Sequence, residues 1–159
     1  QLISRPKEAA LASRLIQAVK EAFGADPVRV GRSLRVFHYA KQLASKEGGD
    51  PRVVLAAALL LGIGPATPGP AGQPSQARQI LQQTGAGEDT IGRVCEIVEG
   101  HQAGRETDSI EFRIVQDADT LAGLAAEGPP TAPDTLQNAL GDRLKTDAAK
   151  QKARTLFRA

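Results

Sequence analysis

Residues 55–70, "LAAALLLGIGPATPGP", contain an apolar run that ends at Gly62 and is followed by a segment of proline, glycine and alanine. With the preceding residues 50–54, "DPRVV", the run predicts a helix that begins at an Asp-Pro cap and is apolar on nearly every side. A helix of this kind is usually the central, buried one of a bundle. No acidic residue or histidine stands at the junction where this helix ends.

Helical spacing of apolar residues continues on both sides of this segment, and no stretch alternates like a strand. The sequence therefore predicts an all-α fold, a single domain over residues 1–159 built as a bundle of about seven helices. Ser4 can cap the first helix, and the N-caps predicted for the next five helices are Asp26, Asp50, Ser75, Asp89 and Ser109. The predicted helices occupy residues 4–23, 27–47, 51–63, 75–85, 89–100, 109–124 and part of 136–156, with loops at 64–74 and 127–134.

Composition narrows the classes of function. The 159 residues carry a net charge of +2 with no basic block, which argues against nucleic acid as a partner. The single cysteine, Cys95, excludes an internal disulfide and is expected to be inert core. No apolar run approaches the ~20 residues of a membrane span. Because residues 1–19 mix charges into their apolar stretch, they do not resemble a signal peptide, and we expect a cytoplasmic protein.

The chain has two histidines, and each has two interpretations. His38 follows Leu34 by four residues, on or beside the apolar face of its helix. It is either a hydrogen-bonded histidine at the edge of the core or a metal ligand. His101 follows Gly100 near a predicted helix end, where it is either a cation facing the helix dipole or a functional group.

Four charged residues on predicted helices are further candidates. Asp117 and Asp119 lie in an otherwise apolar helix, about 200° apart around its axis, so they cannot face the same site. The carboxylate that points inward needs a partner or a metal. Arg32 and Arg35 lie three residues apart, share a helix face and could meet a phosphate or a buried carboxylate.

Five segments, in this order, resemble the HD-domain metal-dependent phosphohydrolases. That family has His-x-x-Arg-Val in one helix, then an alanine-rich helix that ends in Leu-Leu-His-Asp-Ile-Gly. The resemblance extends over residues 26–157 and includes the Lys-Thr motif of small bacterial members. The segments are "GRSLRVFHYAKQLASKEGGDPRVVLAAALLLGIG", "SQARQILQQTG", "IGRVCEIVEGHQ", "FRIVQDADTLAGL" and "LKTDAAKQKARTLF".

The resemblance places substitutions at the family's metal-binding positions. Its first histidine corresponds to Arg32, because Arg35 and Val36 match the family's Arg-Val. The defining His-Asp pair corresponds to Leu61 and Gly62, neither of which has a side chain that can coordinate a metal.

The later part of the family pattern is better preserved. His101 keeps one histidine of a histidine-rich corner, although Gln102 replaces its neighbour, and Asp119 matches the last ligand. A catalytic metal needs about three protein ligands and an open position, so the resemblance implies that the metal centre is lost. If the family geometry holds, the guanidinium of Arg32 replaces the cation and pairs with Asp119.

Three functions follow from these observations. The first is a catalytically degenerate HD-domain protein that has no cofactor and binds a nucleotide or other phosphorylated small molecule, or serves regulation. Its ligand-binding residues would be Arg32, Arg35, His101 and Asp119. The second is an active phosphohydrolase whose divalent metal is held by His38, His101, Asp117 and Asp119. The third is a structural or protein-interaction module, for example a homodimer.

Overall fold

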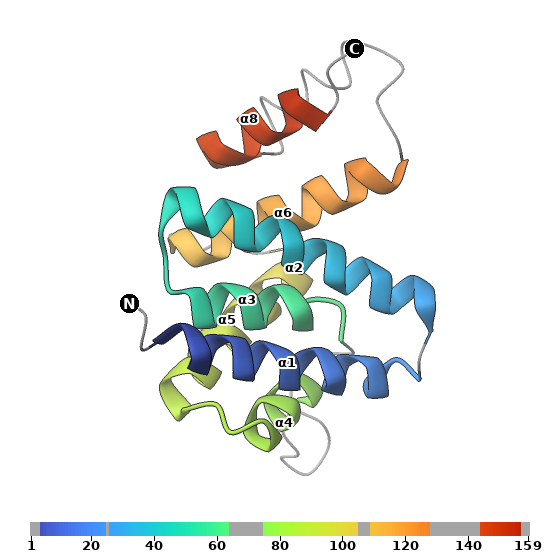
Figure 1. Cartoon of the computed structure of the whole chain (residues 1–159), viewed down its shortest axis with the longest axis vertical. Coiled ribbons are helices and arrows are strands. Elements are labelled where there is room, and N and C mark those ends of the chain that lie inside the picture. Colours follow the sequence, from blue (N-terminus) through green and yellow to red (C-terminus); the bar gives the residue numbers. More distant parts are fainter. Residues whose placement is uncertain (1–3, 25, 64–74, 105–108, 128–143, 157–159) are drawn as a thin grey trace.

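The computed structural model describes residues 4–24, 26–63, 75–104, 109–127 and 144–156. Across these residues the chain forms seven helices and no strand, as Figure 1 shows, which confirms the predicted all-α bundle. The predicted loop at 64–74 and residues 128–143 lie outside the described residues. The helices are α1 (Ser4–Ala22), α2 (Pro27–Glu47), α3 (Pro51–Leu60), α4 (Gln76–Gln83), α5 (Glu88–Ala103), α6 (Ile110–Glu127) and α8 (Asp147–Leu156).

Four of the five N-caps predicted after the first helix are present, because a short polar side chain beside a helix start satisfies backbone donors that the helix itself cannot. Asp26 Oδ1 accepts from the N–H of Val28 at 3.0 Å, and Asp50 Oδ1 accepts from the N–H of Arg52 at 3.1 Å. The hydroxyls of Ser75 and Ser109 accept in the same way at 3.3 and 3.1 Å.

The start of α5 differs from the prediction. Its N-cap is Gly87, which makes no side-chain capping bond, so Asp89 lies inside the first turn. There its negative charge faces the positive end of the helix dipole, which stabilises the same helix end by a different interaction. The prediction that a helix starts near Asp89 is therefore confirmed, whereas the prediction that Asp89 is its N-cap is wrong.

The apolar helix α3 is the centre of the bundle, as the opening stretch predicts. It contacts α1, α2, α5 and α6, and in Figure 1 it lies between α1 and α2 with α5 behind it. Leu59 and Leu60 at its end are fully buried, and Leu61 just beyond is 6% exposed. Cys95 of α5 belongs to the same core, where burial raises the pKa of its thiol and so keeps it protonated and unreactive. None of the described helices combines the length and hydropathy needed to cross a membrane.

Asp117 is the carboxylate of α6 that points inward, and it fastens the start of α8. Its side chain is fully buried and accepts from the backbone N–H of Lys145 at 2.8 Å and of Thr146 at 2.7 Å. The hydroxyl of Thr146 donates to it at 2.8 Å. Burial raises the pKa of Asp117, and these hydrogen bonds oppose that rise. The Lys-Thr motif that resembles small family members therefore provides the partners of a buried carboxylate.

Replacing Asp117 by alanine leaves three buried donors without an acceptor, and we expect it to lower the free energy of unfolding by about 3 kcal/mol. Urea unfolding followed by circular dichroism measures this change. Glu96→Ala, at an exposed position of α5, is the control and should change the free energy by less than about 0.5 kcal/mol. Equal effects of the two substitutions would contradict the anchoring role of Asp117.

Candidate functional site

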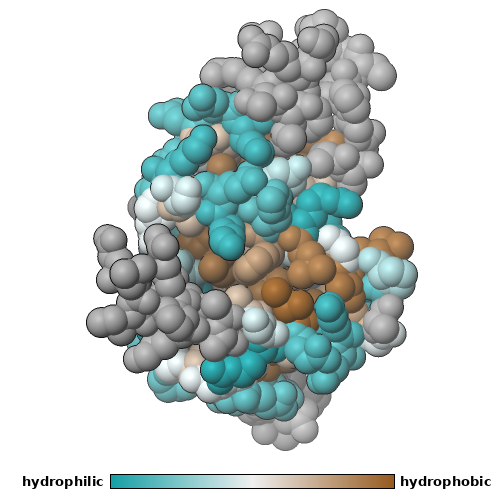
Figure 2. Space-filling view, in the orientation of Figure 1, coloured by the Kyte–Doolittle hydropathy of each residue, from teal (hydrophilic) through white to brown (hydrophobic). Residues whose placement is uncertain are grey.

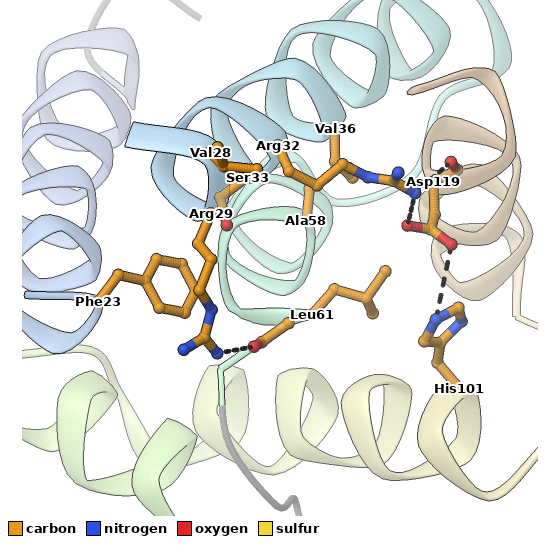
Figure 3. A pocket seen from close by; sticks show the side chains of 11 residues that line it. Phe23, Val28, Arg29, Arg32, Ser33, Val36, Ala58, Leu61, His101 and Asp119 are labelled. Carbon is orange, nitrogen blue, oxygen red and sulfur yellow. Dashed lines mark hydrogen bonds and ion pairs between the residues drawn. The ribbon is translucent and has the colours of Figure 1, made fainter. Parts of the chain in front are cut away.

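A cavity of about 310 Å³ opens where α3 ends, with α2 on one side and α5 and α6 on the other. Figure 2 shows an apolar area in the middle of one face of the molecule, bordered by hydrophilic side chains. The side chains labelled in Figure 3 come from the end of α1, from α2, from the end of α3, from α5 and from α6. The lining residues are Phe23, Val28, Arg29, Arg32, Ser33, Val36, Ala58, Leu61, Gly62, His101 and Asp119.

An ion pair between α2 and α6 crosses one side of the cavity. Arg32 Nη2 donates to Asp119 Oδ1 at 2.8 Å and to the main-chain oxygen of Asp119 at 3.0 Å. His101 of α5 places Nε2 3.6 Å from the other carboxylate oxygen, Oδ2. Figure 3 shows the three side chains in a row along this wall. The predicted pairing of Arg32 with Asp119 is therefore present.

A second guanidinium, Arg29, lines the opposite side of the cavity. Its central carbon lies 4.3 Å from the centroid of the Phe23 ring, and its Nη2 makes a long hydrogen bond of 3.5 Å to the carbonyl oxygen of Gly62. Sequence reasoning missed Arg29. It precedes Arg32 by three residues and Ser33 by four, so the spacing of one helix face could have identified it.

Arg35 lies elsewhere, although it was expected to share the face of Arg32. It is exposed and does not line the cavity, because the face of α2 that does so continues from Arg32 to Val36. A step of three residues turns a helix by about 300°, which leaves the two side chains about 60° apart. Arg29 makes the same step to Arg32 and still lines the cavity, so the step alone does not decide. Arg35 is outside because it lies on the side of Arg32 that faces away from Ser33 and Val36.

Leu61 and Gly62 form the part of the cavity where the resemblance places the family's His-Asp pair. The side chain of Leu61 extends from the end of α3 toward the Arg32–Asp119 pair (Figure 3). Gly62 is exposed, and a Cβ at this position would have no heavy atom within 4 Å. The cavity floor is therefore aliphatic beside Leu61 and has room for a side chain at Gly62.

The described part of the chain brings few potential metal ligands together. Among the described residues, no group of three or more His, Cys, Asp or Glu side chains is placed to hold an ion. The four side chains of the alternative metal site predicted from the sequence, those of His38, His101, Asp117 and Asp119, therefore do not form one cluster. His38 is exposed and hydrogen-bonded to Gln42 at 3.0 Å, Asp117 is occupied at the start of α8, and only His101 and Asp119 lie close together.

Comparison with known protein families shows to which class this all-α bundle belongs. The model of the HD domain matches residues 29–124, which is more than half of the chain, so the chain belongs to the HD-domain family. The matched range contains every lining residue of the cavity except Phe23 and Val28.

Two solved structures of Bacillus subtilis YpgQ share the fold. The structure in complex with ADP has a TM-score of 0.63 at 22% sequence identity, and a second YpgQ structure has 0.65 at 23%. Each similarity covers 94% of this chain and 89% of that chain. A comparison with curated protein sequences found no match.

A double-mutant cycle of Arg32→Gln and Asp119→Asn measures the strength of the ion pair. Because the two side chains are 42% and 28% exposed, we expect a coupling free energy of about 1 kcal/mol in unfolding experiments at low salt. The coupling should decrease at 1 M salt, which screens partly exposed charges. A coupling near zero at low salt would show that the two side chains do not interact in solution.

Proposed function

We propose that this chain is an HD-domain protein with a degenerate metal site, which binds a nucleotide or other phosphorylated small molecule instead of hydrolysing it by the metal-dependent route. Such binding would suit a regulatory role. The observation that carries the proposal is the ion pair between Arg32 and Asp119. It puts a fixed positive charge at the position that corresponds to the family's first metal-binding histidine.

The number of donors supports the loss of the metal. A catalytic zinc ion takes about three protein ligands and keeps one position for water. At the four corresponding positions, only Asp119 can coordinate, and its carboxylate already binds the guanidinium at 2.8 Å. A divalent cation beside Arg32 would also be repelled by the positive charge.

The two guanidiniums support an anionic ligand. Arginine presents its N–H groups in a planar fork that matches the oxygens of a phosphate group. A cavity of about 310 Å³ is at the lower end of the sizes usual for small-molecule sites. ADP in the YpgQ complex makes adenine nucleotides the first ligands to test.

A thermal-shift screen against phosphorylated compounds tests ligand binding. A ligand at one hundred times its Kd stabilises the folded state by about 2.7 kcal/mol, which raises the Tm of a chain of this size by about 5–10 °C. We expect such a shift with at least one nucleotide, without added metal. No shift with any nucleotide or sugar phosphate would contradict the proposal and favour the protein-interaction module.

Restoring the family's ligands tests whether the metal site was lost by side-chain replacement alone. We expect the triple variant Arg32→His, Leu61→His and Gly62→Asp to retain about one Mn²⁺ or Fe²⁺ per chain after desalting, measured by elemental analysis, whereas the unmodified chain retains none. Adding Asp119→Asn to the triple variant removes the last ligand and should abolish retention. Stoichiometric metal in the unmodified chain, together with phosphatase turnover, would overturn the proposed function.

A further inference from the structure

The two guanidiniums of the cavity differ in charge balance. Arg32 is neutralised by Asp119 at 2.8 Å. Arg29 forms no ion pair with any carboxylate of the described residues, and residues 64–74, which follow the end of α3, contain no acidic residue. The positive charge that remains available to bind an anion in this cavity is therefore that of Arg29.

Arg29 is also held in position, and within the described parts of the chain it uses few of its donors. The face of its guanidinium lies on Phe23, an arrangement stabilised by the cation–π attraction. Of the five N–H groups of a guanidinium, it uses one in the long bond to the Gly62 carbonyl. Stacking occupies a face of the group and leaves its N–H edge available to an anion.

The floor of the cavity, by contrast, is apolar. Val36 is 3% exposed, Ala58 is 1% exposed and Leu61 is 6% exposed, and none of these side chains can donate a hydrogen bond. A phosphate group placed against these three side chains would lose water without gaining a donor from them, which is strongly unfavourable. An apolar or aromatic body, by contrast, is stabilised by burial there.

We propose that the ligand lies with its aromatic body inward, against Leu61, and with its phosphate outward, at Arg29. This inference rests on the proposed function and specifies its ligand class. The cavity takes a phosphate ester of a flat aromatic body, such as a nucleoside monophosphate, in preference to a sugar phosphate or inorganic phosphate. Arg32 and Asp119 form the side wall and contribute less to phosphate affinity than Arg29 does.

Isothermal titration with four probes tests the ligand class on the unmodified protein. AMP should bind at least tenfold more tightly than ribose 5-phosphate, which lacks the base, and than adenosine, which lacks the phosphate. Inorganic phosphate should bind most weakly of the four. Ribose 5-phosphate or inorganic phosphate binding as tightly as AMP would overturn the orientation, because the base would then contribute nothing. Failure of every nucleotide and every sugar phosphate to bind would instead refute the proposed function itself.

Substitutions identify the residue that holds the phosphate. Arg29→Gln should weaken AMP at least tenfold and leave the affinity for adenosine unchanged, because charge-assisted hydrogen bonds to phosphate are lost. Arg29→Lys, which keeps the charge without the fork, should restore part of the affinity. Arg35→Gln, on the same helix but outside the cavity, is the matched control and should leave AMP affinity unchanged.

The double variant Arg32→Gln and Asp119→Asn removes the side-wall pair without changing the net charge of the cavity. We expect it to weaken AMP by a smaller factor than Arg29→Gln does. A larger effect in this double variant than in Arg29→Gln would place the phosphate at Arg32 and overturn the inference. Melting curves of each variant, followed by circular dichroism, show whether the folded state is retained, and Arg29 is exposed enough for its loss to be tolerated.

Discussion

The pairing of Arg32 with Asp119 joins α2 to α6, the two described helices that pack most extensively against each other. Its geometry bears directly on the chemistry of the cavity, because a carboxylate whose charge is balanced by a guanidinium at 2.8 Å attracts a metal ion less strongly than a free one does. In addition, arginine keeps its charge at any physiological pH. Under the proposed function, the cation beside Asp119 is therefore one that belongs to the chain itself.

The scaffold around this pair depends on the burial of α3 and on the contacts of Asp117. Helix α3 is buried on nearly every side, and Leu61, just beyond its end, remains in the core. The buried Asp117 is occupied by the start of α8, which leaves Asp119 as the carboxylate of α6 that reaches the cavity. The anchoring of α8 is thus separate from the site, whereas the apolar lining of the cavity is also part of the core.

Structural features that depend on neighbouring residues could be predicted from the sequence, whereas features that depend on residues far apart in the chain could not. The caps at Asp26, Asp50 and Ser75 could be predicted because a cap and its helix are adjacent in the chain. Periodicity could not decide which of the two α6 aspartates points inward, since that depends on α8, 28 or 29 residues further along. The spacing of one helix face could have identified Arg29 as a lining residue, but its hydrogen bond to Gly62, 33 residues further along, depends on the fold.

The most direct test of the account is an anomalous-scattering map from crystals of the unmodified protein grown with excess Mn²⁺. The account predicts that Arg32 remains bonded to Asp119 and that no anomalous peak lies within coordination distance of that carboxylate. A strong peak beside Asp119, with the guanidinium of Arg32 displaced, would contradict the claim that a side chain has taken the place of the metal.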